Sequence, residues 1–331
     1  MRVQSESGGP LRVLVAGAGT MGHGLALVMA RAGHEIVLTD VDEKMLNRAL
    51  KLIEGYLRMF VEMERMDGAA IPEVMGRIRT ATELDELEGQ DLVIESISED
   101  RDIKKEFYRE TAAHCSPGTI VASNTSYLDV FELAPESLQK RLLISHFFAP
   151  PYLIPLVEIV KGPETLQKVA LRMSKILKEA GQKPVILEKF IPGFIVNRLQ
   201  RAMGREIFHL MDGGYAKPEE IDRAVLASLS IRIPVLGVVR RYDFAGLDLA
   251  VKVLSNPSIG LMDEDRPSRT LDDLVAGGHL GVKTGKGFYD YHGEDLQQIY
   301  RKRDRLLMLM RDALEEIEEV LWQDQEACYK E

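Results

Sequence analysis

His146 and Glu158 are the residues of this sequence whose types and spacing suggest proton transfer. His146 lies in an apolar run at 142–147, Glu158 lies in a second run at 154–160, and a proline-rich turn separates the runs. Because prolines stiffen the turn, neighbouring strands could bring the imidazole and the carboxylate together. Such a pair suits the oxidation of an alcohol: the imidazole takes the hydroxyl proton, and the carboxylate fixes its tautomer and stabilises the imidazolium. The alternative for His146 is a structural residue at a strand end, since histidine is commonly of intermediate burial.

A glycine-rich segment near the amino terminus has the spacing of a phosphate-binding turn. Residues 17–22 read Gly-Ala-Gly-Thr-Met-Gly and match GxGxxG between an expected strand and an expected helix. The three glycines would allow a tight turn, the approach of backbone to a pyrophosphate, and close packing of helix on strand. The alternative is a glycine-rich turn with a structural role only. We assign the phosphates of a dinucleotide to the start of this helix, with contacts from Gly17, Gly19, Thr20, Met21 and Gly22.

Asp40 has the position expected of a ribose-binding carboxylate. It ends the second expected strand, 18 residues after Gly22, close to the spacing of about 20 residues found in dinucleotide-binding folds. Val41, Asp42 and Glu43 follow, so a 2′-phosphate would meet carboxylates and no arginine. This favours NAD over NADP. The alternatives for Asp40 alone are a solvated acid at a strand end and an N-cap of the next helix.

The elements around these residues alternate between strands and helices. Apolar, β-branched runs occur at 11–16, 34–40, 91–96, 119–124, 142–147, 154–160 and 183–190. Strands that alternate with helices predict an α/β fold, here an N-terminal Rossmann-type doubly wound sheet. The region 42–80 is longer than one crossover helix needs and contains Gly68 and Pro72, which predicts an inserted helical hairpin.

The second part of the chain is expected to be an all-helical C-terminal domain. From Gly193 onward the sequence has helical periodicity with scattered Gly and Pro. We expect a flexible leader at 1–10, an NAD-binding domain at 11–190, a helical substrate and dimerisation domain at 191–293, and an amphipathic helix at 294–331. The apolar positions of that helix fit a heptad in which Arg303 fills one place: Leu296, Tyr300, Leu307, Met310, Leu314, Ile317 and Leu321. The helix could dock on a partner subunit or pack on its own domain.

Composition excludes several kinds of partner. The 331 residues carry a net charge of −10, which works against binding to nucleic acid or to an anionic membrane. Cys115 and Cys328 lie far apart without metal-ligand spacing, so we expect neither a disulfide framework nor a bound metal. The first ten residues are polar, and no run of about 20 apolar residues occurs. We therefore expect a cytoplasmic protein.

Six segments, in this order, resemble the 3-hydroxyacyl-CoA dehydrogenase family: VAGAGTMGHGLA, VIESISEDRDIKKE, SNTSYL, HFFAPPYLIPLVEIV, GFIVNRLQ and KTGKGFYDY. The likeness covers residue 11 to about residue 291. It implies an oxidoreductase of fatty acid metabolism that transfers a hydride from C3 of a 3-hydroxyacyl-CoA to NAD, with His146 as the base and Glu158 as its partner. It also implies that Ser126 and Asn197 hold the substrate oxygen, as a hydroxyl and a side-chain amide can.

The resemblance assigns the nicotinamide side of the cofactor to Glu99, Lys104 and Asn124. The alternatives are a solvated charge run for Lys104 and a turn position for Asn124. Asn197 could be a helix N-cap, but it falls inside an apolar helical pattern, where an amide needs a partner. Because Asn197 must be held over the nicotinamide by a domain with a limited core, we expect a homodimer.

The turn between His146 and Glu158 departs from the acyl-CoA pattern. The family usually has asparagine where Ala149 stands, and the PPYxxPLVE form resembles the branch with lambda-crystallin, L-gulonate 3-dehydrogenase and carnitine dehydrogenase, which acts on free hydroxy acids. The HFF segment and the insertion favour an acyl-CoA. Lys51, Arg58 and Arg65 recur every seven residues there, so a helix would place them on one stripe facing the coenzyme A phosphates.

We predict oxidation of a short-chain 3-hydroxyacyl-CoA to the 3-oxoacyl-CoA. The alternatives are a dehydrogenase of a small free 3-hydroxy acid of the gulonate or carnitine type, and a crystallin-like or regulatory protein that binds NAD without turnover. The last alternative needs only the glycine turn and Asp40, so the retention of His146, Glu158, Ser126 and Asn197 argues against it.

Overall fold

The structure, a computed structural model, describes residues 9–83, 85–262, 268–291 and 293–322. Most of the expected leader, the end of the expected C-terminal helix and Cys328 lie outside these residues. The chain divides into two compact units, Met1–Val196 and Asn197–Glu331, six residues beyond the boundary expected at 190. The extra residues belong to the first unit because the amides of Ile195 and Val196 are bound by a strand residue of that unit.

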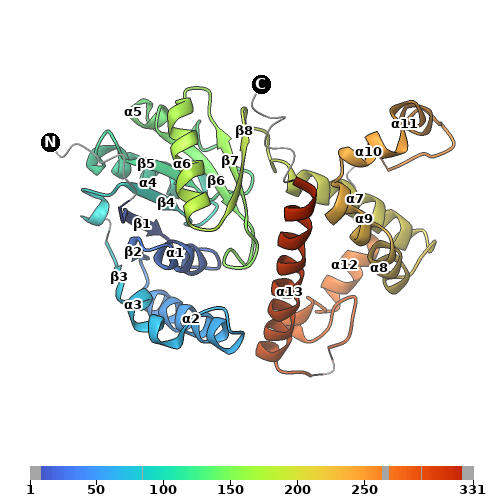
Figure 1. Ribbon diagram of the computed structural model, residues 1–331, viewed down its shortest axis with the longest axis horizontal. Helices are drawn as coiled ribbons and strands as arrows, with labels where there is room; N and C mark the ends of the chain where they lie inside the picture. Colours follow the sequence, from blue (N-terminus) through green and yellow to red (C-terminus); the bar gives the residue numbers. More distant parts are fainter. Residues whose placement is uncertain (1–8, 84, 263–267, 292, 323–331) are drawn as a thin grey trace. The chain divides into compact units, whose positions relative to one another are not determined.

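The first unit is built on one eight-stranded sheet (Figure 1). Its strand order is β3-β2-β1-β4-β5-β6-β7-β8, and all neighbours are parallel except β6 and β7. The strands are β1 (Arg12–Ala16), β2 (Glu35–Thr39), β3 (Ile78–Ala81), β4 (Leu92–Glu95), β5 (Ile120–Ser123), β6 (Leu142–Phe147), β7 (Leu156–Lys161) and β8 (Lys183–Leu187). The order reverses between β1 and β4, and the crevice at such a point is where parallel α/β sheets bind their ligands. The predicted doubly wound sheet is confirmed.

Helices connect the strands of this unit. They are α1 (Gly22–Arg31), α2 (Glu43–Glu62), α3 (Ile71–Gly76), α4 (Arg101–His114), α5 (Glu136–Gln139) and α6 (Gln167–Glu179). The helices α2 and α3 occupy the region expected to be an inserted hairpin, but its end forms the edge strand β3, which the sequence did not predict. Two of the four β3 residues, Arg79 and Thr80, are exposed, so this strand lacks the apolar run that marks the buried ones.

The second unit is helical over its described residues. It contains α7 (Val196–Asp212), α8 (Pro218–Ala227), α9 (Leu229–Leu236), α10 (Arg240–Ala245), α11 (Leu247–Leu254), α12 (Arg269–Ala276) and α13 (Leu296–Trp322), with α7 starting at the last residue of the first unit. Asp212, at the end of α7, accepts hydrogen bonds from Ser268, Arg269 and Thr270 at the start of α12, and these lower its pKa to about 2.

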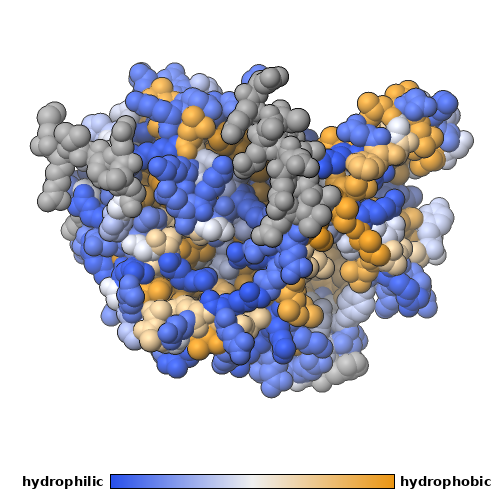
Figure 2. All heavy atoms as spheres, in the orientation of Figure 1, coloured by the Kyte–Doolittle hydropathy of each residue, from blue (hydrophilic) through white to orange (hydrophobic). Residues whose placement is uncertain are grey.

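Large apolar side chains of this unit are exposed, and Figure 2 shows them gathered around α10 and α11.

The burial of α13 differs from the expected heptad. Asp304 and Met308 are its most buried described residues, whereas Met310, on the expected seam, is 52% exposed. Leu307, Leu314 and Ile317 of the heptad are half-buried, so the burial of α13 departs from the heptad only in part. None of the described helices is long and apolar enough to cross a membrane.

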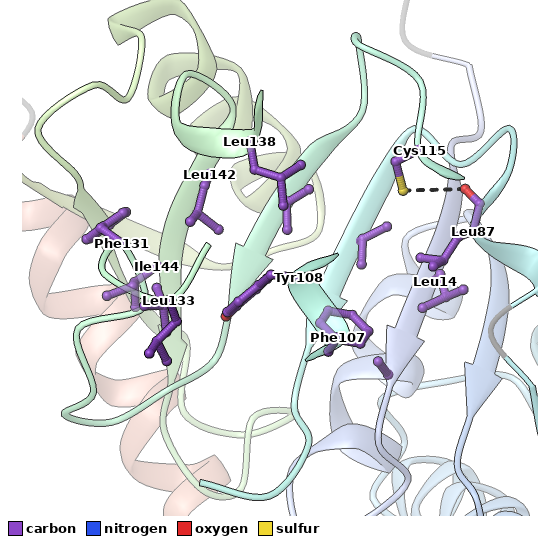
Figure 3. Close-up of a cluster of buried hydrophobic side chains, with 14 of the residues drawn as sticks. Leu14, Leu87, Phe107, Tyr108, Cys115, Phe131, Leu133, Leu138, Leu142 and Ile144 are labelled. Atoms are coloured by element: carbon purple, nitrogen blue, oxygen red, sulfur yellow. Dashed lines mark hydrogen bonds between the residues drawn. The ribbon is translucent and has the colours of Figure 1, made fainter. Parts of the chain in front are cut away.

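One buried cluster of the first unit lies on the face of the sheet that α4 covers (Figure 3). The β1 residue Leu14, the β6 residue Ile144 and the α4 residues Phe107 and Tyr108 belong to one buried cluster. The strand residues in it are fully buried because helices cover both faces of a parallel sheet. Cys115 lies at the edge of the cluster, and burial raises the pKa of its thiol to about 11.

Candidate active site

The glycine turn between β1 and α1 leaves space for a ligand at one position and none at two others. A Cβ on Gly17 would lie 2.4 Å from the Ser96 carbonyl oxygen, and one on Gly22 would lie 1.7 Å from the Gly17 oxygen. A Cβ on Gly19 would meet nothing within 4 Å. Gly17 and Gly22 are therefore required by the close approach of β4 and of the turn itself, and Gly19 keeps the open side free. Thr20 and Met21 follow on that side, directly before α1. This arrangement suits a pyrophosphate at a helix N-terminus.

Asp40 is held in place beside the glycine turn. Its Oδ2 accepts a hydrogen bond from the Ala18 amide (2.8 Å), and its Oδ1 accepts one from the Asp42 amide (3.1 Å). The N-cap of α2 is Asp42, whose side chain accepts from the Lys44 amide. Asp42, and not Asp40, is therefore the N-cap of α2. The Asp40 carboxylate is fixed at the carboxyl end of β2, the end at which ligands bind.

His23 is a residue of this region that sequence reasoning missed. Its Nδ1 lies 2.7 Å from the Gly19 carbonyl oxygen, and its ring stacks on Tyr56 of α2. Tyr56 in turn contacts Tyr152 of the turn after β6, with ring centroids 4.2 Å apart. Burial lowers the pKa of His23. Its position directly after the last glycine was the only sequence signal that could have identified it.

His146 and Glu158 face each other across β6 and β7. They are paired in the antiparallel register, and His146 Nδ1 lies 2.9 Å from Glu158 Oε2. Both side chains are buried, at 5% and 0% exposure. The second carboxylate oxygen, Oε1, accepts hydrogen bonds from the amides of Ile195 (2.9 Å) and Val196 (3.0 Å). The carboxylate is therefore fixed on both sides, and it sets the orientation of the imidazole.

The turn after His146 packs closely on α1. A Cβ on Gly24 would lie 2.5 Å from the Pro151 side chain, so glycine is required there. The His146 ring contacts the rings of Phe148 and Phe194, at centroid distances of 4.6 and 5.2 Å. These contacts enclose the imidazole in an apolar setting, which strengthens its interaction with Glu158.

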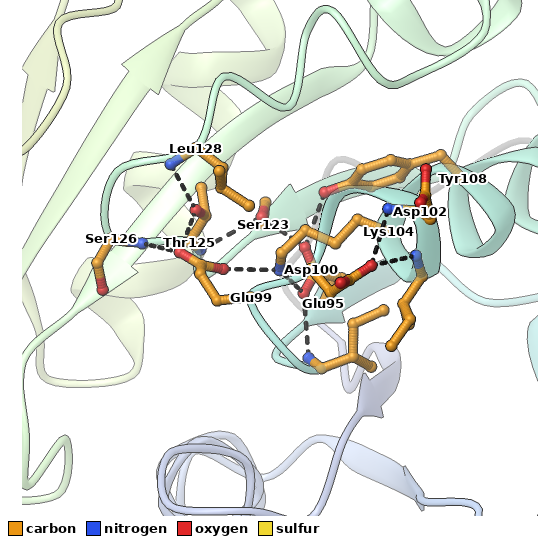
Figure 4. Close-up of polar contacts among 12 residues, drawn as sticks. Glu95, Glu99, Asp100, Asp102, Lys104, Tyr108, Ser123, Thr125, Ser126 and Leu128 are labelled. Carbon is orange, nitrogen blue, oxygen red and sulfur yellow. Dashed lines mark hydrogen bonds and ion pairs between the residues drawn. The ribbon is translucent and has the colours of Figure 1, made fainter.

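Glu99 and Lys104, two of the residues assigned to the nicotinamide side, lie with Ser126 in one network near the ends of β4 and β5 (Figure 4). The alternative for Lys104, a position in a solvated charge run, is wrong: its side chain is 1% exposed, with Nζ 2.5 Å from Glu95 and 3.1 Å from Glu99. Lys104 turns inward because it lies on the face of α4 that packs on the sheet. The Glu99 carboxylate accepts hydrogen bonds from the Thr125 hydroxyl and the Ser126 amide. Burial opposes the ionisation of Glu99, but these bonds and the charge of Lys104 outweigh it and lower its pKa.

Asn124 connects this network to β6, and its amide donates to the Glu95 carbonyl oxygen at 2.7 Å. Its side-chain oxygen accepts a hydrogen bond from the Phe147 amide, next to His146, at 2.9 Å. Asn197 belongs to the second unit, within α7 and not at a cap position before it. Its role in holding the substrate stays a prediction. Among the residues that the structure describes, no group of three or more His, Cys, Asp or Glu side chains is placed to hold a metal ion.

Comparison with known proteins identifies the family. The NAD-binding domain of 3-hydroxyacyl-CoA dehydrogenase matches residues 12–190, and the C-terminal domain of the same enzyme matches residues 193–291. The chain therefore belongs to the 3-hydroxyacyl-CoA dehydrogenase family, as the sequence motifs indicated, and it is an NAD-dependent oxidoreductase of that family.

Relatives of two kinds share most of their length with this chain. A probable 3-hydroxybutyryl-CoA dehydrogenase of Bacillus subtilis is 34% identical over 282 residues, which cover 85% of this chain and 97% of the relative. The 5-formyl-3-hydroxy-2-methylpyridine 4-carboxylate 5-dehydrogenase of Mesorhizobium japonicum is 30% identical over 306 residues, which cover 92% and 98%. A crystal structure of a 5-dehydrogenase for the same pyridine compound, described as an NAD+-dependent dismutase, superimposes with a TM-score of 0.82 at 28% identity, covering 92% of this chain and 99% of that one.

The fixed carboxylate of Asp40 leads to a prediction about the cofactor. We expect kcat/KM to be about 100-fold higher with NAD than with NADP, because the 2′-phosphate would meet Asp40 and Asp42. Asp40→Asn removes one negative charge, so the ratio of kcat/KM for NAD to kcat/KM for NADP should fall at least about tenfold. Asp91→Asn is the matched control, since Asp91 also accepts a backbone amide, at the opposite end of the sheet. Steady-state kinetics with both cofactors measure the ratios, and equal use of NADP by the unmodified protein would contradict the assignment.

Proposed function

We propose that this protein catalyses the NAD-dependent, reversible oxidation of the 3-hydroxyl group of a short-chain 3-hydroxyacyl-CoA. The observation that carries the proposal is the buried pair of His146 and Glu158, 2.9 Å apart, on strands next to the dinucleotide-binding half of the sheet. NAD, bound over the glycine turn and Asp40, supplies the acceptor for the hydride that leaves C3. The chain's own residues then have to move one proton and hold one oxygen.

The proton moves to His146. With Nδ1–H donating to Glu158, the other ring nitrogen, Nε2, is the basic one and takes the hydroxyl proton. The imidazolium that forms is stabilised by the Glu158 carboxylate. Because the amides of Ile195 and Val196 hold that carboxylate, it does not have to reorganise during the step. Ser126 and Asn197 would orient the C3 oxygen with a hydroxyl and an amide group.

Support for the acyl-CoA carrier comes from α2. Lys51 and Arg58 are exposed on this helix. The prediction that three basic residues share one face of a helix is wrong for Arg65, because α2 ends at Glu62. Arg58 forms an exposed ion pair with Glu54, and exposed pairs contribute only about 0–1 kcal/mol. A phosphate group of coenzyme A could therefore replace Glu54 at little cost.

A second candidate substrate is a small free carboxylate. The Mesorhizobium japonicum relative, named for a pyridine carboxylate, matches 92% of this chain, and the related crystal structure superimposes with a TM-score of 0.82. Ala149 also stands where acyl-CoA members usually have asparagine. A small substrate would not need the basic residues of α2.

A substrate panel separates the two candidates. We expect the highest kcat/KM with 3-hydroxybutyryl-CoA, against 3-hydroxybutyrate, 5-formyl-3-hydroxy-2-methylpyridine 4-carboxylate and a thioester without the nucleotide. Arg58→Glu should raise KM for the CoA thioester about 3- to 10-fold and leave the truncated thioester unchanged, since only the carrier contacts α2. Arg109→Glu, which alters an exposed, ion-paired arginine further along α4, is the matched control. Activity with free acids or the pyridine compound alone would refute the acyl-CoA assignment.

A double-mutant cycle tests the catalytic pair. His146→Ala should lower kcat by about 10²- to 10⁴-fold with NAD affinity nearly unchanged, and Glu158→Gln should slow the same step. Because the two residues act as one unit, the double variant should be only slightly slower than the slower single variant. His114→Ala, at an exposed histidine, is the control. Fully multiplicative losses would show that the residues act independently, and unchanged turnover would favour an NAD-binding protein without catalysis.

The second unit supports a homodimer. Apolar side chains of α10 and α11 are widely exposed, among them Phe244 at 72%, Val251 at 64% and Leu254 at 75%. A contiguous apolar surface of this kind is typical of an interface, and two-fold pairing is the commonest form of oligomer. We propose that these helices pair between two copies of the chain.

Light scattering measures this association directly. At micromolar concentration we expect a particle of about twice the 37.2 kDa chain mass. Leu254→Glu should shift it toward the monomer, because a charge would be buried in the interface. Leu171→Glu, at a 54% exposed position of α6 in the first unit, should leave the dimer intact. A monomeric unmodified protein would contradict the proposal.

A further inference from the structure

Glu95 is a fully buried carboxylate in which every oxygen is bound to donors. Its Oε1 accepts from the Ile97 amide (3.0 Å) and from Lys104 Nζ (2.5 Å), and its Oε2 accepts from the hydroxyls of Tyr108 (2.7 Å) and Ser123 (2.6 Å). Glu95 is 0% exposed. The proposed function assigns it no part, and neither does the resemblance of the sequence. Four donors on one buried carboxylate are the environment of an ion, not of a neutral acid.

The charges of this cluster do not cancel. Among the residues that the structure describes, Lys104 is the one ammonium bound to the carboxylates Glu95 and Glu99, so these three groups together carry one net negative charge. Tyr108 does not add to it: burial and then the charge of Glu95 raise its pKa well above the usual value, so its hydroxyl stays protonated. Of the charged groups close by in the chain, Asp100 caps α4 and adds negative charge, and Arg101 forms an exposed pair with Glu132.

The cluster lies on the nicotinamide side of the cofactor site. Asp40, the ribose carboxylate, is at the end of β2, on one side of the crevice between β1 and β4. Glu95 ends β4 on the other side, and Ser96, the next residue, abuts the glycine turn at Gly17. Since a dinucleotide lies across this crevice, its nicotinamide half extends toward β4 and β5.

We propose that Glu95 is an electrostatic positioning residue: with Glu99 it leaves a partly buried net negative charge beside the nicotinamide, which favours the cationic ring of NAD+ over the neutral ring of NADH. This inference rests on the proposed placement of the cofactor. Through Lys104 and Glu99 the same network holds the amide of Ser126, so the charge that acts on the cofactor also fixes the loop that meets the substrate. The oxidised form of the cofactor is thereby stabilised where the alcohol is oxidised.

Glu95→Gln isolates the charge. A glutamine has the same shape: its oxygen can accept from Ile97 and Lys104, while its amide group can donate to the hydroxyl oxygens of Tyr108 and Ser123, which accept as well as donate. The net charge of residue 95, Glu99 and Lys104 then changes from one negative charge to zero. Tyr108→Phe is the matched control, since it removes a hydrogen bond from the same carboxylate without changing the charge.

The ratio of dissociation constants, Kd for NAD+ over Kd for NADH, is the measurement, with NADH followed by fluorescence and NAD+ by competition. We expect Glu95→Gln to raise this ratio roughly tenfold, since a charge in a partly buried site acts through an effective dielectric constant of about 20. Tyr108→Phe should change it less than about threefold, because no charge is altered. A purely structural role would weaken both cofactors equally.

The controls separate the failure of this inference from that of the proposed function. If folded Glu95→Gln protein binds both cofactors with an unchanged ratio, or if Tyr108→Phe moves the ratio as much, the inference is overturned. If the unmodified protein binds neither cofactor, the proposed function itself fails. If Glu95→Gln does not fold, Glu99→Gln replaces it as the test. It removes one negative charge from the same cluster, at a side chain that is 28% exposed, and it must also raise the ratio.

Discussion

The two oxygens of Glu158 connect the parts of this protein that do chemistry. One oxygen orients His146 on the neighbouring strand, and the other binds the amides of Ile195 and Val196, where α7 begins. A buried carboxylate is stable only when donors satisfy it, so the sheet, the proposed base and the last residues of the first unit are constrained together. Loss of the carboxylate would therefore leave the imidazole without its partner and two amides without an acceptor.

The net negative charge of this protein repels an anionic dinucleotide, and the local geometry of the binding site overcomes this repulsion. The net charge of −10 offers no general attraction, but the glycine turn presents backbone amides at the N-terminus of α1, and Gly19 leaves that side open. The contacts of Ser96 with Gly17 and of Pro151 with Gly24 bring β4 and the catalytic turn against the same loop and helix. Cofactor site and base are thus positioned by close backbone packing, which tolerates no side chain at these glycines.

The buried ion pairs of Lys104 lie where the nicotinamide half of the cofactor would bind. Most ion pairs of this unit, such as Arg58 with Glu54, are exposed and contribute little, whereas Lys104 is buried between Glu95 and Glu99. Burying the ionised Lys104 and Glu95 is costly, and replacement by apolar residues is often neutral or stabilising. A network that persists despite this cost points to a role beyond stability.

The sequence by itself determined the doubly wound sheet, the glycine turn and the positions of Asp40, His146 and Glu158, because each depends on local pattern: apolar runs, glycine spacing and a proline turn between two strands. Tertiary structure decided what depends on contacts far along the chain. Lys104 sits in a charge run that looks solvated, and only the packing of α4 on the sheet turns it inward. His23 gained a partner from α2, β3 formed because β2 had a free edge, and the most buried residues of α13, Asp304 and Met308, lie outside its heptad. In each case the deciding contact is made with a segment far along the chain, which the local sequence does not contain.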